Sequence, residues 1–153
     1  LLVAGGAIGE LTAVCVWSQS APVATATPSA TPTVALPPEA EQVLIRYAQA
    51  FEQEDPVIFA GCFWDARSYL PLFQDVCRDW FDIQVQFLQI KAYAGSQKEE
   101  LLLSVRIQSR MRENRTRQLV RLVSAAEFVL ERRDKEWRIV SIRTRPEKPP
   151  REP

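Results

Sequence analysis

Residues 69–93 read YLPLFQDVCRDWFDIQVQFLQIKAY, and the hydrophobic period changes within this stretch. Up to Trp80, apolar residues recur every three or four positions, which is the spacing of one face of an α-helix. From Ile83 onward they alternate with polar residues, which is the spacing of a half-buried strand. The apolar residues change parity between Phe87 and Leu88, and this predicts a β-bulge that bends the strand. The stretch therefore predicts a helix that leads directly into a long, bent strand.

Two further helices are predicted upstream of this stretch. Apolar residues between Ala40 and Phe51 follow the helical spacing, and Asp55 can cap a second, short helix over 56–63. Pro38 and Pro56 each suit the first turn of a helix, where the missing N–H leaves no bond unmade. The sequence thus places three helices before the first long strand.

Alternating segments continue downstream of the bent strand and are separated by turns. The turns are expected at Gly95-Ser96, near Glu113-Asn114 and at Asp134-Lys135. Three helices followed by an antiparallel meander predict an α+β fold, with the three N-terminal helices packed on a strongly bent, mostly antiparallel sheet of four or more strands.

The N-terminal part of the chain differs in composition from this domain. Residues 1–17 are apolar except for Glu10 and Thr12, and residues 18–38 form an uncharged linker rich in Pro, Thr and Ala. The first segment fits a signal-anchor helix, the apolar core of a cleaved signal peptide, or a lipoprotein signal ending at Cys15. We expect a domain over 39–145 and a disordered tail over 146–153. The expected location is outside the cytoplasm, anchored to the membrane or, after cleavage, secreted.

Two short motifs resemble the nuclear transport factor 2-like superfamily, whose cone-shaped fold includes ketosteroid isomerases and SnoaL-like polyketide cyclases. The first is RYAQAF at 46–51, followed by Asp55 and then FAGCF at 59–63. The second is EWRIV at 136–140, which looks like the last strand of that fold. The resemblance covers residues 39–144 and implies a cavity between helices and sheet, for which Tyr47, Tyr69 and Trp80 are the candidate ligand contacts.

The residues that would carry the isomerase chemistry are not the required types. The resemblance places the oxyanion-binding tyrosine at Tyr47 but the general base at Pro71, which cannot accept a proton. The chain has no histidine, so it lacks the commonest general base and metal ligand, and its cysteines do not have zinc spacing. We therefore assign no catalytic residues, no metal and no cofactor.

Charge divides the chain unequally, although its 19 basic and 19 acidic residues balance. Residues 1–100 carry a net charge of −7 and residues 101–153 a net charge of +7. Arg112, Arg115 and Arg117 lie in an arginine-rich hairpin and are the candidate partner-binding residues. No aromatic residues are interleaved there, which argues against nucleic acid and favours an acidic protein patch or an anionic lipid surface. The sheet face is a further candidate surface for a homodimer.

Cys62 and Cys77 both end apolar helical faces. An exported domain would favour a disulfide between them, and two small buried thiols are the equal alternative. Taken together, the sequence favours a non-enzymatic, membrane-tethered, extracytoplasmic interaction or scaffold domain. The alternative is a small-molecule-binding or isomerase- or cyclase-like domain that uses the cone cavity. The sequence does not identify the partner, the ligand or the oligomeric state.

Overall fold

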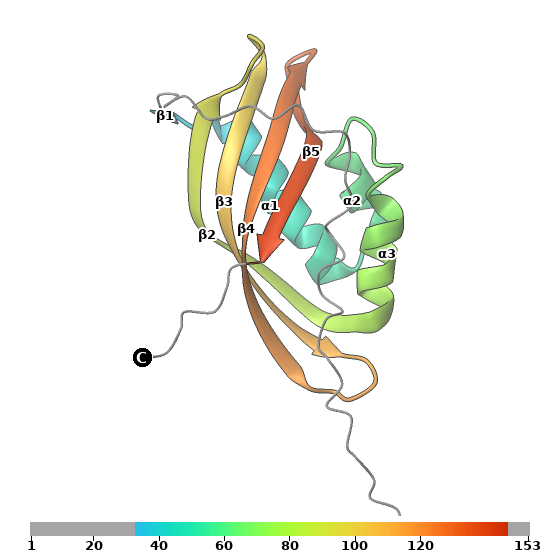
Figure 1. Cartoon of the computed structure of the whole chain (residues 1–153). Coiled ribbons are helices and arrows are strands. Elements are labelled where there is room, and N and C mark those ends of the chain that lie inside the picture. The colour runs from blue at the N-terminus through green and yellow to red at the C-terminus, as the bar shows by residue number, and fades with distance from the viewer. Residues whose placement is uncertain (1–32, 147–153) are drawn as a thin grey trace, which may run out of the picture.

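The computed structural model describes residues 33–146, which form three helices and a curled five-stranded sheet (Figure 1). The predicted membrane segment over 1–17, the linker up to residue 32 and the tail from residue 147 lie outside the described residues. Within 33–146 no helix has both the length and the apolar character needed to cross a membrane. The predicted α+β class, with helices on one face of a bent antiparallel sheet, is confirmed.

The three helices begin where the sequence places their start signals. They are α1 (Pro38–Gln53), α2 (Pro56–Gly61) and α3 (Leu70–Asp79). Each has a proline in its first turn, where no intrahelical donor is lost. α1 ends at Glu54, which has a left-handed φ of 52° and sends its N–H back to the carbonyls of Ala50 and Phe51.

Five antiparallel strands follow one another in the sheet in chain order. They are β1 (Thr33–Val34), β2 (Trp80–Ala94), β3 (Glu100–Glu113), β4 (Leu119–Arg133) and β5 (Glu136–Pro146). The predicted bulge is present in β2, where the register shifts between Phe87 and Gln89. A second shift between Phe81 and Gln84 was not predicted, and together the two shifts bend β2 twice.

β1 lies within the segment predicted as linker. Thr33 pairs with Tyr93 and Val34 with Ala92, so the ordered domain begins six residues before the predicted boundary at residue 39. A strand of two residues is too short to show hydrophobic alternation. Backbone pairing with β2 and the packing of Val34 against the core hold it in place. β1 is too short to cover more than one end of β2.

Aromatic side chains fill the space between the helices and the concave face of the sheet. α1 crosses this face, and α2 and α3 lie beside it near β5 and the lower part of β2 (Figure 1). Phe59 stacks on Phe73 with ring centroids 4.3 Å apart, and Phe51 contacts Phe73 at 4.9 Å. Phe128 brings the sheet into the same cluster, 5.5 Å from Tyr47. The interior of the cone is therefore packed, and hydrophobic burial there holds the helices to the sheet.

The turn between β3 and β4 lies further along the chain than the sequence suggested. It covers residues 114–118 rather than Glu113-Asn114, with Arg117 in the left-handed region at a φ of 62°. The tip of this hairpin reaches the end of α3, where the backbone N–H of Asn114 donates to Asp79 at 2.9 Å and its side-chain amide to Arg78 at 2.5 Å. These bonds satisfy carbonyls that the helix end leaves free, and they fix the hairpin against α3.

Replacing Asp55 with alanine is expected to lower the free energy of unfolding by about 1 kcal/mol. The Asp55 carboxylate accepts hydrogen bonds from the N–H groups of Val57 at 2.7 Å and Ile58 at 3.1 Å, so it caps α2. Urea unfolding followed by circular dichroism measures the change. Asp75→Ala is the matched control because that exposed carboxylate forms a surface ion pair with Arg78 and caps no helix. Equal losses in the two variants would contradict the capping role.

Candidate functional site

The three residues predicted to line a ligand cavity are engaged in packing. Tyr47 is 5% exposed and its ring contacts four other aromatic rings, while burial raises the pKa of its phenol well above the usual value. Tyr69 stacks on Phe63 at 4.8 Å, and its hydroxyl accepts a hydrogen bond from the backbone N–H of Ile142 at 3.2 Å. Trp80 is half-buried at the start of β2. Their role as ligand contacts stays a prediction, and in the structure they pack against the core.

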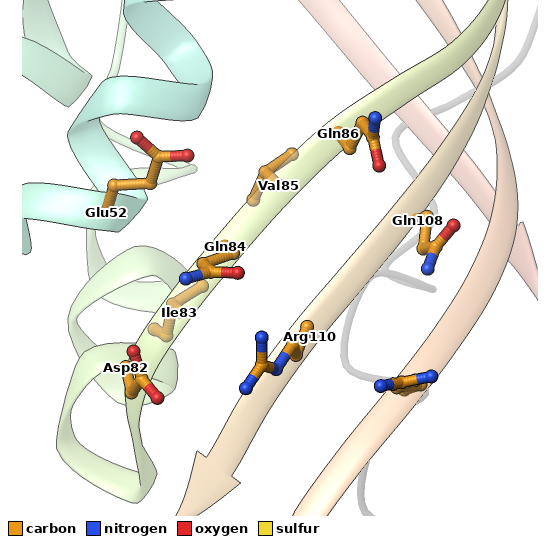
Figure 2. Close-up of a pocket in the computed structure, with 9 residues that line it drawn as sticks. Glu52, Asp82, Ile83, Gln84, Val85, Gln86, Gln108 and Arg110 are labelled. Carbon is orange, nitrogen blue, oxygen red and sulfur yellow. The ribbon is translucent and has the colours of Figure 1, made fainter.

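A polar cleft of about 680 Å³ lies elsewhere, at the edge of the sheet next to the end of α1. Its volume falls within the usual range of about 300–1,000 Å³ for ligand sites. Figure 2 shows Glu52 on α1 across from β2, and Gln108 and Arg110 on the neighbouring strand β3. The lining residues are Glu52, Asp82, Ile83, Gln84, Val85, Gln86, Gln108, Arg110 and Arg121.

Five consecutive residues of β2, from Asp82 to Gln86, line this cleft. Successive side chains of a strand point to opposite faces of its sheet. Ile83 is buried on the core side, whereas Gln84 is exposed on the outer side. A cleft that both sets line follows the edge of the strand rather than one face of the sheet.

Two arginines from neighbouring strands make the outer wall of the cleft cationic. Arg110 of β3 is directly opposite Arg121 of β4, and Gln84 of β2 is directly opposite Arg110. Met111, next to Arg110, is buried in the core, so Arg110 points to the outer face. Like charges directly opposite each other across a strand pair are unfavourable. This pair therefore lowers the stability of the sheet unless an anion lies between the two guanidinium groups.

The Nε of Arg110 is buried and has no hydrogen-bond partner within the part of the chain that the structure describes. An unpaired buried donor costs about 1–3 kcal/mol. The nearby acids do not relieve this. Asp82 pairs instead with Arg112 at 3.3 Å, and Glu52 stands across the cleft on α1. The cleft thus offers the positive charge of Arg110 and Arg121 to a carboxylate or phosphate group supplied from outside.

The arginines predicted to bind a partner are placed differently from one another. Arg112 pairs with Asp82, and the guanidinium of Arg117 lies 4.7 Å above the centre of the Phe81 ring. Arg115 is exposed in the turn. Two of the three therefore have contacts that hold the β3–β4 hairpin to β2, and a partner-binding role for all three stays a prediction.

The sequence did not predict that Arg110 and Arg121 lie directly opposite each other, because the turn was expected two residues earlier than its place in the structure. A turn at Glu113-Asn114 would place Arg110 opposite Arg117 instead of Arg121. The only local signal for the true turn is the left-handed Arg117, and arginine does not mark such a conformation in a sequence.

Cys62 and Cys77 are both free thiols in the structure. Cys62 is fully buried and its thiol donates to the carbonyl of Ile58 at 3.3 Å. Burial raises the pKa of Cys62 to about 11, against the lowering effect of Arg46 and Arg138. Burial also raises the pKa of Cys77 to about 11, with a further contribution from Glu54. Neither thiol is activated as a nucleophile.

Comparison with known proteins identifies the fold but no close relative. No family model matches the chain, and no curated protein does. A nuclear transport factor 2-like superfamily protein from Salmonella enterica superimposes with a TM-score of 0.60, at 10% identity over 73% of this chain and 92% of that one. A ketosteroid isomerase-like protein from Erwinia carotovora atroseptica gives 0.58, at 12% identity over 71% and 94%. This chain has the nuclear transport factor 2-like fold.

The same fold is found in a hexachlorocyclohexane dehydrochlorinase, with a TM-score of 0.60 and 8% identity over 71% of this chain and 82% of that one. The nuclear transport factor 2-like fold thus serves enzymes and other proteins, and identities this low carry over no activity. At the positions that the resemblance singled out, Tyr47 is buried among aromatic rings and Pro71 lies in the first turn of α3. Across residues 33–146 no group of three or more acidic, cysteine or histidine side chains could hold a metal ion.

Proposed function

We propose that this domain is a non-enzymatic interaction domain that binds an acidic segment of a partner protein at the polar cleft. The observation that carries the proposal is the Arg110–Arg121 pair, two cationic side chains at directly opposite positions that both line the cleft. A carboxylate that lies beside the two guanidinium groups would offset this unfavourable pairing of like charges. Charge-assisted bonds of this kind are among the strongest in proteins.

The outer face of the sheet supports an acidic partner rather than a second copy of the chain. Arginines from three strands lie on this face, and two of them, Arg110 and Arg121, line the cleft. Glu127 of β4 lies opposite Arg143 and Ser104 in the sheet. The members are Arg106, Arg110, Arg112, Arg121, Arg143 and Arg145. Two such faces would repel each other, whereas an acidic surface would be attracted over about a Debye length, roughly 8 Å at physiological salt.

The packed cone supports a non-enzymatic role. Small-molecule enzymes need a pocket with acid or base groups placed beside it. Here the candidate phenol at Tyr47 is buried and enclosed by aromatic rings. We further propose that residues 1–17 tether the domain to the membrane outside the cytoplasm, with residues 18–32 as a spacer, because that apolar segment precedes an uncharged, proline-rich stretch.

The cleft is tested with a hexaglutamate peptide and the double variant Arg110→Gln/Arg121→Gln. The parent is expected to bind the peptide at about 20 mM salt and more weakly at about 150 mM, because salt screens the attraction. The double variant should lose tenfold or more in affinity, as measured by isothermal titration calorimetry. Its fold should persist, because removal of the pair also removes a repulsion.

Arg67→Gln/Arg78→Gln is the matched control, since it removes the same charge from exposed arginines paired with Asp65 and Asp75. The control should bind like the parent. Equal losses in both double variants would mean that only net charge matters, and would overturn the assignment of the cleft. Binding to phosphatidylglycerol vesicles without binding to the peptide would show that the surface recognises a membrane and not a protein.

The fold itself favours the second candidate function, a small-molecule site, because a dehydrochlorinase shares it. A small carboxylate could occupy the same cleft between Arg110 and Arg121. Titration with acetate separates the two functions. If acetate binds as tightly as the peptide, the cleft recognises a single carboxylate and no extended partner is needed.

A further inference from the structure

The N-terminal half of β2, which contains Asp82–Gln86, has a strand beside it on one side only among residues 33–146. β3 pairs with one side of β2 along nearly its whole length. On the other side, among the strands of residues 33–146, only β1 pairs with β2, and it reaches no further than Ala92 and Tyr93. The segment from Asp82 to Gln86 therefore has backbone N–H and C=O groups on its outer side that no strand in this range pairs with. Such an edge is a template for another strand.

We propose that the polar cleft binds its partner by strand addition, so that a short extended peptide with alternating acidic and apolar residues becomes a sixth strand beside β2. This inference rests on the proposed function and specifies how the acidic partner is read. Main-chain hydrogen bonds supply affinity in this mode of recognition, and alternate side chains supply specificity. The position of the cleft, along five successive residues of the free edge, is the observation that carries it.

The length of the peptide follows from the two irregularities in β2. One register shift lies between Phe81 and Gln84, and the other between Phe87 and Gln89. Bulges disrupt a strand ladder and turn the edge away from a neighbour. The regular segment between them runs from Gln84 to Phe87, which is four residues, or roughly 13 Å at the usual rise of a strand. A peptide of about five residues is long enough to cover it.

The side chains on each face of the edge define which residue types the peptide carries. On the outer face a peptide side chain would lie beside Gln84, with Arg110 immediately beyond it on β3. An added strand lies about 5 Å from β2 and about 10 Å from β3, a gap that a glutamate and an arginine can close together. On the core side the peptide would meet Ile83, Val85 and the carboxylate of Glu52. That side favours apolar residues and repels acids.

A second copy of this chain is a poor occupant of the edge. Two β2 edges paired about a twofold axis would bring the arginines of both outer faces together. They would also place the two Glu52 carboxylates on the same side of the new pair. Like charges across paired strands are destabilising. An acidic peptide makes the same main-chain bonds and reverses the sign of the side-chain interaction.

The test compares three peptides of five residues with blocked ends. The first alternates glutamate and valine, beginning and ending with glutamate. The second has the same composition with its three glutamates together. The third has the alternating sequence, and every second backbone nitrogen carries a methyl group. The methylated nitrogens are those whose N–H groups would donate to β2, so this peptide cannot make the main-chain bonds. Isothermal titration calorimetry gives the affinities, and amide hydrogen exchange of the parent reports on β2.

The alternating peptide is expected to bind at least tenfold more tightly than the block peptide and to slow exchange at amides between Asp82 and Gln86. N-methylation should abolish binding. If all three peptides bind equally, the cleft recognises charge alone, and strand addition is wrong while the proposed function stands. If none binds, and hexaglutamate does not bind either, the proposed function fails as well.

A pair of variants keeps the test independent of the peptide chemistry. Gln84→Glu places a like charge beside the proposed glutamates, and Gln89→Glu makes the same change on the same strand beyond the bulge. Both side chains are exposed, so both variants should fold. The first is expected to weaken binding of the alternating peptide at least fivefold and the second to leave it within twofold. Equal affinities for the two variants would overturn the placement of the peptide.

Discussion

Phe59→Ala is expected to lower the free energy of unfolding by about 3–5 kcal/mol, the usual cost of deleting a buried phenyl ring. Phe59 is fully buried and stacks on Phe73 at 4.3 Å. It also contacts Phe63 at 5.0 Å and Phe51 at 5.6 Å. Alanine would leave a cavity among rings that are fixed from the helices and the sheet, so the surrounding structure can collapse only in part. Urea unfolding measures the loss. The slope of the unfolding free energy against urea concentration should stay the same as in the parent.

Val57→Ala is the matched control, because this side chain lies on the same short helix and is 79% exposed. It should change the unfolding free energy by no more than about 0.5 kcal/mol. Phe59→Leu should fall between the two variants. A loss below about 1 kcal/mol for Phe59→Ala would show that the cone interior tolerates a void. It would then favour a ligand cavity over the packed interior on which the proposed function depends.

The thiol of the half-buried Cys77 is expected to react with iodoacetamide about 100-fold more slowly at pH 8 than an unperturbed cysteine, because only the thiolate attacks and its fraction falls tenfold per unit of pKa. Cys62 should react more slowly still, because it is fully buried and the reagent does not reach it. Both thiols have a pKa raised to about 11 by burial, compared with an ordinary value of 9.0. The measurement uses a Cys15→Ser variant so that only these two thiols are present. Mass spectrometry of the alkylated protein separates them.

The rate should rise with pH up to about 11 instead of levelling near 9. The folded protein keeps these protons between pH 9 and 11, where the unfolded chain has lost them. The contribution of the two buried thiols to the free energy of unfolding is therefore fully present below about pH 9, and it is lost as pH rises through the folded pKa of about 11. In urea both thiols should react at the ordinary rate. If they react in urea only after a reductant is added, the two cysteines form a disulfide, and the alternative in which both are free is wrong.

The sequence by itself determined the layers of this protein. The change of hydrophobic period near Asp82 separates helices from strands, and side-chain spacing alone produces that change. Proline and aspartate signals located the helix starts, since they act through the backbone of their own turn. The parity change at Phe87-Leu88 located one bulge, because two consecutive apolar residues break the alternation of faces along a regular strand. All of these signals are local.

The tertiary structure alone decided where the cleft lies and what lines it. Arg110 and Arg121 are eleven positions apart, and only the true centre of the β3–β4 turn places them directly opposite each other. β1 exists because two residues of the apparent linker pair with the backbone of β2, a contact too short to show as a side-chain pattern. Among the strands of residues 33–146, its short reach leaves Asp82–Gln86 without a neighbour on the outer side of β2. Register and edge coverage depend on pairing between distant segments, and that pairing is settled only when the sheet folds against the helices.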